Sequence, residues 1–153
     1  MKSKKAFTLI EILLVIGIIV LLAGAVIVAI NPGRQFAKAR NTQRTTDVNA
    51  ILSGILQVMT DNQGRWSCPG STYYSTSLPP MITTTIVATS ETNTTEINLS
   101  CLVPNYLPKL PVDPSLATSS LTTEYTLFYN TSTGRITVCA PRAELGETIC
   151  TQR

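Results

Sequence analysis

One carboxylate, Glu11, stands near the start of a long apolar run and close behind a short basic leader. The 19 residues from Ile12 to Ile30 carry no polar side chain, and as a helix they would rise about 28 Å, close to the hydrocarbon thickness of a bilayer. A charge inside such a segment costs roughly 2.5–3.5 kcal/mol on insertion scales. A charge that is kept there usually has a partner and a role. The pattern therefore favours a membrane-held subunit of an assembly, and it argues against a soluble enzyme.

The flanks of the apolar run do not match an ordinary secretory signal. Residues 1–6 form a basic leader, and no convincing small-residue cleavage site followed by a mature start comes after the run. Ala23-Gly24-Ala25 lies within the run and signals late cleavage only weakly. The lysines of the leader favour an N-terminus inside the cell, but a basic cluster follows the run and conflicts with that count. The cluster consists of Arg34, Lys38, Arg40 and Arg44.

The block from Lys4 to Leu22, KKAFTLIEILLVIGIIVLL, resembles the N-terminus of type IV pilins and the related pseudopilins. The resemblance implies that a prepilin peptidase cuts between Ala6 and Phe7, that Phe7 is then N-methylated, and that Glu11 is the glutamate typical of the family. The family usually has Gly before the cut, where this chain has Ala6. We expect slower cleavage at worst, because Ala is the smallest possible change.

The resemblance also implies how Glu11 finds a partner. In a filament the apolar helices pack into a shared core, where a carboxylate is strongly unfavourable unless it is paired. In the family the partner is the amino group of a neighbouring subunit's Phe7, which cleavage frees. Assembly would be driven by an ATPase and a membrane platform. Residues 7–30 would span the cytoplasmic membrane once before assembly, with the N-terminus inside, and would form the core of an extracellular filament afterwards.

The residues after the apolar run predict a second helical stretch over 31–62. Pro32 and Gly33 should kink or briefly interrupt the long helix. Further on, apolar residues recur at helical spacing and form one stripe, and Asn62-Gln63-Gly64 is a stop signal. The stripe comprises Val48, Ile51, Leu52, Ile55, Leu56 and Met59.

The charge balance argues against a strong nucleic-acid footprint. The chain carries 12 basic and 9 acidic residues, and removing the leader's Lys2, Lys4 and Lys5 leaves 12 − 3 = 9 basic residues against 9 acidic ones. The Arg34–Arg44 cluster could touch DNA or lipid head groups. A solvated or inter-subunit face is the favoured interpretation of that cluster.

Residues 63–153 predict a β-rich head packed on the second half of the helix. The overall expectation is an α+β fold, ladle-shaped as in pilins, with a small antiparallel sheet. Asn130 to Gly134 reads as a hairpin loop. Thr83-Thr84-Thr85 and the Ser/Thr runs near Ser90 and Ser119 are interpreted as loops or sheet edges. The β-prone runs are Met81–Ala88, Glu96–Val103, Glu124–Asn130, Arg135–Cys139 and Glu147–Cys150.

The head contains all four cysteines, Cys68, Cys101, Cys139 and Cys150. An even number in an exported domain indicates two disulfides, for which three connectivities are possible. Cys68–Cys101 and Cys139–Cys150 are favoured, because each closes a modest loop near a predicted strand or turn. A zinc site is disfavoured, because the chain has no CxxC motif and no His.

The proline-rich connector from Pro104 to Pro114 has no predicted regular structure. It resembles the stretch before the final hairpin of some pilins and major pseudopilins. Some pseudopilins bind calcium in a loop of this region, so Asp113 invites a calcium hypothesis. One Asp is not a ligand set, however, and no EF-hand spacing is present. No cofactor is therefore expected, with calcium as the alternative.

No catalytic constellation is visible, so we do not expect an enzyme. The leading hypothesis is a structural subunit of a type IV pilus or pilus-like filament. One alternative is a pseudopilin of a type II secretion system. Another is a minor tip or priming subunit that binds a surface, DNA or secreted cargo. The retained Glu11 and the compact head favour a repeating subunit.

Overall fold

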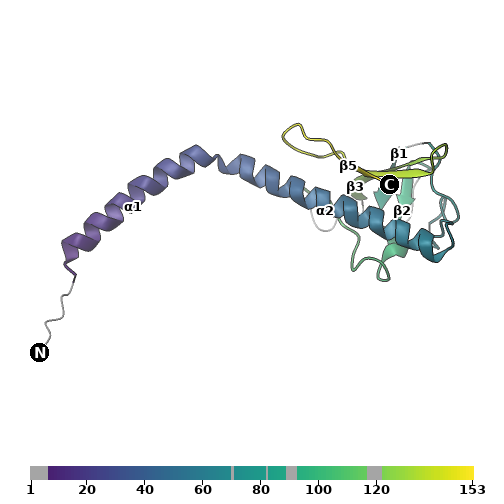
Figure 1. Cartoon of the computed structure of the whole chain (residues 1–153), viewed down its shortest axis with the longest axis horizontal. Helices are drawn as coiled ribbons and strands as arrows, with labels where there is room; N and C mark the ends of the chain where they lie inside the picture. The colour runs from purple at the N-terminus through teal and green to yellow at the C-terminus, as the bar shows by residue number, and fades with distance from the viewer. Residues whose placement is uncertain (1–6, 70, 82, 89–92, 117–121) are drawn as a thin grey trace, which may run out of the picture. The chain divides into compact units, whose positions relative to one another are not determined.

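The computed structural model describes residues 7–69, 71–81, 83–88, 93–116 and 122–153 (Figure 1). The leader with Ala6, and the Ser/Thr runs near Ser90 and Ser119, lie outside the described residues. The chain divides into two compact units, with the boundary between Phe36 and Ala37. The first unit contains helix α1, Leu9–Ile30, and the start of helix α2, Pro32–Asp61. The second contains the rest of α2 and all five strands.

The two helices are separated by a single residue, Asn31. Its backbone is left-handed, with φ 49°, a conformation that Asn tolerates better than most residues. A proline disfavours the α conformation in the residue before it but is well suited to the first position of a helix. The predicted break at Pro32 and Gly33 therefore takes the form of an interruption at Asn31, and Pro32 begins α2.

The five strands form one sheet with the order β2-β1-β3-β4-β5. The C-terminal three strands form an antiparallel meander, and the Asn130–Gly134 loop joins β3 to β4 as predicted. Gly134 takes φ 70° in this loop, and its N–H donates to the carbonyl oxygen of Asn130 over 2.8 Å. The strands are β1 Thr83–Val87, β2 Glu96–Asn98, β3 Thr122–Asn130, β4 Arg135–Ala140 and β5 Ile149–Gln152.

The predicted antiparallel pairing is found between β1 and β3, β3 and β4, and β4 and β5, whereas β1 and β2 pair in parallel, so the sheet is mixed. The interpretation of Thr83-Thr84-Thr85 as a loop or sheet edge was wrong. These residues belong to β1, which lies between β2 and β3, and Thr84 is fully buried with its hydroxyl donating to the Leu127 carbonyl oxygen. A Thr hydroxyl can satisfy itself on a neighbouring strand's backbone, so a Thr run is compatible with a central strand. Glu96–Val103 forms a shorter strand than predicted, followed by a 3-10 turn at Ser100–Leu102.

The hydrophobic core lies between α2 and one face of the sheet. The predicted stripe supplies Val48, Ile51, Leu52 and Ile55, all at most 1 % exposed, and Val58 joins them. Inward-facing residues of β3 alternate with half-buried ones, as expected for a sheet with one covered face. The main contributions from the sheet are Ile86, Ile97, Tyr125, Leu127, Ile136 and Val138.

Two disulfides tie the head together. They join Cys68 to Cys101 and Cys139 to Cys150, the two pairs that the sequence favoured. The first links the loop after α2 to the 3-10 turn, and the second links β4 to β5. Cys139 and Cys150 lie opposite each other on β4 and β5, so this disulfide closes the loop that connects the two strands.

Candidate functional site

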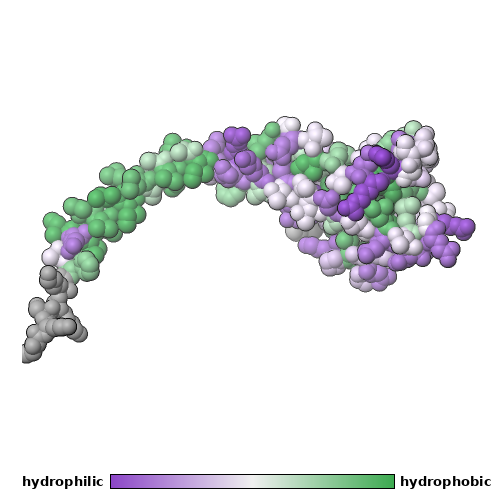
Figure 2. All heavy atoms as spheres, viewed as in Figure 1, coloured by the Kyte–Doolittle hydropathy of each residue, from purple (hydrophilic) through white to green (hydrophobic). Residues whose placement is uncertain are grey.

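The side chains of α1 are exposed in the part of the chain that the structure describes. None of its 22 residues is buried, and Figure 2 shows an almost unbroken apolar surface along it. α1 is long and apolar enough to cross a membrane, with a mean hydropathy of 3.3. Exposed apolar area on this scale marks a surface that lipid or other protein covers.

Glu11 lies in the first turn of α1, where Thr8 caps the helix. The Thr8 hydroxyl oxygen accepts from the backbone N–H of Glu11 over 3.3 Å. A Thr followed three residues later by Glu is the sequence pattern of a capping box, and a carboxylate near a helix N-terminus is also favoured by the helix dipole. Among the described residues, no hydrogen bond or ion pair reaches the Glu11 carboxylate. The cap is a local structural reason for a Glu at position 11, but it does not provide a cation for the carboxylate.

A buried ion pair anchors the start of the second unit. Arg44 of α2 is 1 % exposed and donates through Nε and Nη2 to both carboxylate oxygens of Asp113, at 2.8 and 3.0 Å. Burial would raise the pKa of Asp113, but the hydrogen bonds from Arg44 and Ser115 outweigh it and hold that pKa below its usual value. A two-pronged pair of this kind is strong and geometrically specific.

The same face of α2 holds the loop between β4 and β5. Arg40 donates to both carboxylate oxygens of Glu144 at 2.6 Å, and Arg44 adds a third bond at 3.0 Å. The amide of Asn41 donates to the Glu144 carbonyl oxygen at 2.8 Å and accepts from the Glu144 backbone N–H at 3.0 Å. Hydrogen bonds from Arg40 and then Arg44 lower the pKa of the Glu144 carboxyl to about 2. The loop is therefore bound through both its side chain and its backbone.

The interpretation of the Arg34–Arg44 cluster as a solvated or inter-subunit face was wrong for Arg44, which is buried. Arg40 forms an ion pair with Glu144 of the same chain. Asn41 and Arg44 lie seven and four residues before Val48, so they continue the apolar stripe backward along one helix face. That spacing was the available signal. It was missed because charged residues are rarely buried unless paired, and the partners come from 69 and 100 residues away.

Asp47, which is also buried, extends this polar region. The hydroxyl of Tyr125 donates to it at 2.7 Å, and so does the side-chain amide of Gln43. Burial, and then the hydrogen bond from Tyr125 to Asp47, raise the pKa of Tyr125. In the part of the chain that the structure describes, every buried side-chain nitrogen or oxygen atom has a partner, as a stable buried network requires.

The calcium hypothesis for Asp113 meets a specific obstacle. Both oxygens of that carboxylate already accept hydrogen bonds from Arg44, and a calcium ion would have to displace the guanidinium. No group of three or more acidic, Cys or His residues placed to hold a metal occurs among the described residues. The geometry thus gives Asp113 a structural cation partner within the chain.

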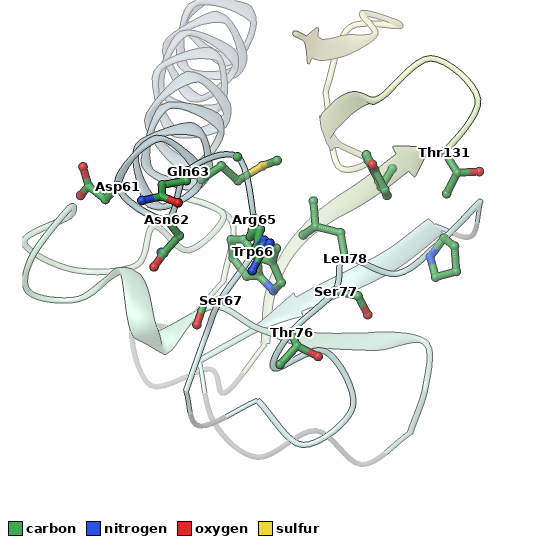
Figure 3. Close-up of a pocket in the computed structure, with 14 residues that line it drawn as sticks. Asp61, Asn62, Gln63, Arg65, Trp66, Ser67, Thr76, Ser77, Leu78 and Thr131 are labelled. Carbon is green, nitrogen blue, oxygen red and sulfur yellow. The ribbon is translucent and has the colours of Figure 1, made fainter.

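A cleft opens at the other end of α2 (Figure 3). It has a volume of about 830 Å³ and lies between the end of the helix, the segment from Thr76 to Pro80, and the start of the β3–β4 loop. Trp66 and Leu78 form its apolar floor, both at most 5 % exposed, and the Trp66 indole N–H donates to the Tyr74 carbonyl oxygen at 2.7 Å. The described residues supply no catalytic set in this cleft.

Residues 1–27 match the family model of the prokaryotic N-terminal methylation motif. This motif is the prepilin signature of type IV pilins and pseudopilins, and the chain carries it over the segment that contains Phe7 and Glu11. No curated protein and no solved structure matches the chain. The motif implies processing by a prepilin peptidase and filament assembly in general. Together with α1, it indicates a membrane-anchored precursor of a pilin-type structural protein.

Replacing Arg44 tests the buried ion pair. Arg44→Met should lower the free energy of unfolding of the second unit by roughly 3–5 kcal/mol, because it leaves Asp113 buried without its cation. Arg142→Met is the matched control, since Arg142 pairs with Glu124 at the surface, where an ion pair contributes about 0–1 kcal/mol. Urea unfolding of the detergent-solubilised chain, followed by the fluorescence of its single tryptophan, Trp66, measures both. Equal small losses would contradict the anchoring role.

The stability of the second unit should fall as pH drops from about 4.5 toward 2. The pKa of Glu144 is lowered from 4.5 to about 2 in the folded chain, so its contribution is complete above the unfolded value and is lost as the pH falls toward the folded one. The pKa of Asp113 is also lowered in the folded chain, so its contribution to stability is likewise lost as the pH falls. Glu144→Gln should flatten the decline in urea midpoint over this interval. A wild-type slope in the variant would show that the Arg40–Glu144 contact does not stabilise the fold.

Proposed function

We propose that this chain is a repeating structural subunit of a type IV pilus or a pilus-like filament. A prepilin peptidase cleaves it between Ala6 and Phe7, and the new N-terminal Phe7 is methylated. An ATPase-driven membrane platform then moves α1 from the bilayer into a helical stack. The function lies in assembly, and α1 forms the core of the filament.

One observation carries this proposal: the methylation motif coincides with a helix whose whole surface is unburied within its own chain. A secretory signal would be discarded, and a plain anchor would not need a charge at Glu11. Lateral packing of many copies covers the apolar surface and brings a cation to the carboxylate. That cation is the amino group of a neighbouring Phe7, created by the cleavage itself.

The proposed orientation places the N-terminus inside before assembly and the head outside. The lysines of the leader support it through the positive-inside rule. The two disulfides of the head support it as well, because they persist in oxidising compartments. Burial of Arg44 and pairing of Arg40 remove two cations from the cluster that conflicted with this topology. The head would form the outer surface of the filament.

The alternative within the same class is a pseudopilin of a type II secretion system, or a minor tip or priming subunit. These share the N-terminal motif and differ in abundance and location. The cleft near Trp66 gives the alternative some support, because a tip subunit needs a surface that binds a partner. The presence of Glu11 favours the repeating subunit.

Mass analysis of sheared cells separates these functions. Filaments released by shearing should contain the chain in abundance, beginning at a methylated Phe7. A processed chain found only in the membrane fraction would favour the pseudopilin or minor subunit. An intact Met1, or cleavage beyond Ile30, would contradict the proposal.

Substitutions at Glu11 separate its two roles. Gln can replace Glu in a capping box but carries no charge, so Glu11→Gln should keep α1 intact and be processed normally, yet assemble several-fold less than wild type. Glu11→Ala removes both roles and should assemble no better than Glu11→Gln. Quantitative blots of sheared and membrane fractions measure the effect. Full assembly of Glu11→Gln would assign this residue to helix capping alone.

A further inference from the structure

Leu145, in the loop between β4 and β5, has an unusual combination of properties. Its backbone is left-handed, with φ 61°, and its side chain is 47 % exposed. An L-residue with a branched side chain is disfavoured in that conformation, and an exposed leucine gains nothing from burial. Residues held at such a cost persist where the surroundings fix them, and they cluster at functional surfaces.

The surroundings of Leu145 do fix it. The Cys139–Cys150 disulfide closes the base of the loop. On one side Asn41 and Arg40 bind the backbone and carboxylate of Glu144, and on the other the Glu147 carboxylate accepts from the Asn41 amide at 3.0 Å. The Glu147 backbone N–H also donates to the Glu144 carbonyl oxygen. The leucine is thus presented on a rigid tip, which reduces the entropy lost on binding.

The cleft at the end of α2 has the complementary character. Its floor is apolar, with Trp66 and Leu78, and its rim carries polar groups such as Asn62 and Thr131 (Figure 3). Arg65 also lines it, is exposed, and has no ion pair among the described residues. The Asp61 carboxylate lines the cleft as well, but it accepts a hydrogen bond from the Tyr106 hydroxyl at 2.8 Å. A leucine followed two positions later by an acidic residue, as in Leu145 and Glu147, matches the apolar floor and the cation Arg65.

The loop cannot fill the cleft of its own chain. Asn41, which holds the loop, and Asp61, which borders the cleft, are 20 residues apart on α2, or about 30 Å along the helix axis. The order of the strands leads to the same conclusion. The β4–β5 loop follows the C-terminal end of β4, whereas the β3–β4 loop, which borders the cleft, precedes the N-terminal end of β4 (Figure 1). Any contact between the two surfaces therefore joins different copies.

We propose that the Leu145 tip of one copy inserts into the cleft of a second copy, with Glu147 facing the Arg65 of that copy. Two different surfaces at opposite ends of one unit make a heterologous, head-to-tail contact, and such contacts propagate into open helical arrays when the rotation does not close a ring. The contact rests on the proposed function, because packing of α1 brings the copies together. It adds a specific register between successive heads.

Photocrosslinking in assembling cells tests the contact directly. The full chain carries the photoreactive residue p-benzoylphenylalanine at position 145, and filaments are sheared after irradiation. The expected product joins two copies, with position 145 linked to the segment 61–78. The same probe at Lys109, an exposed residue outside the cleft, should not label that segment.

The outcomes of this experiment distinguish the two proposals. Linkage to another part of a second copy, or to a different protein, overturns the head-to-tail contact while processed chain in the filaments upholds the proposed function. Absence of the chain from sheared filaments overturns both.

Paired variants give an independent test that does not depend on a probe. Asn tolerates the left-handed backbone, so Leu145→Asn should leave the Trp66-monitored urea midpoint unchanged while lowering filament yield several-fold. Leu145→Met keeps the apolar side chain and should assemble like wild type. Normal yield with Leu145→Asn would overturn the contact.

A charge exchange tests the pairing of Glu147 with Arg65. Arg65→Glu and Glu147→Arg should each lower filament yield, and the double variant should recover most of it. Loss of the Asn41–Glu147 hydrogen bond alone would not be repaired by a change at Arg65. A double variant as defective as the singles would overturn the charge pairing.

Discussion

The exposed apolar surface of α1 must be covered, and the charge of Glu11 within it must be paired. A 22-residue apolar helix with no buried side chain needs a covering that the described residues of the chain do not supply. Lipid can cover the apolar residues but offers Glu11 no cation within the hydrocarbon. Packing of several helices covers both, provided that each copy contributes a positive N-terminus. The proposed cleavage before Phe7 would supply that group and would link proteolytic processing to assembly through one electrostatic requirement.

The second unit also contains a buried charge, that of Arg44, and pairs it with side chains of the same chain. The buried face of α2 is apolar from Val48 onward and polar from Asn41 to Asp47, and Arg44 is as thoroughly buried as the leucines. Its charge is balanced by Asp113 and Glu144, which come from the connector and from the β4–β5 loop. The network therefore adds ionic contacts among three segments, α2, the connector and the β4–β5 loop. It also holds the loop that presents Leu145.

The sequence predicted the features that depend on local pattern. The 19-residue apolar run, the stripe from Val48 to Met59 and the Asn130–Gly134 turn each follow from residues close together in the chain. The parallel pairing of β1 with β2, the central position of Thr84 and the burial of Arg44 depend on partners far along the chain. Spacing placed Arg44 on the buried face, but only the fold reveals Asp113 opposite it. The cleft near Trp66 likewise gathers residues from three separate segments and had no signal in the sequence.

A cryo-electron microscopy reconstruction of the sheared filaments would show how α1 and Glu11 pack between copies. The expected map has a core of packed α1 helices, with the Glu11 carboxylate of each copy within hydrogen-bonding distance of the Phe7 amino nitrogen of another copy. Filaments built of this chain in which α1 lies outside the core, or in which Glu11 has no cationic partner, would contradict this arrangement.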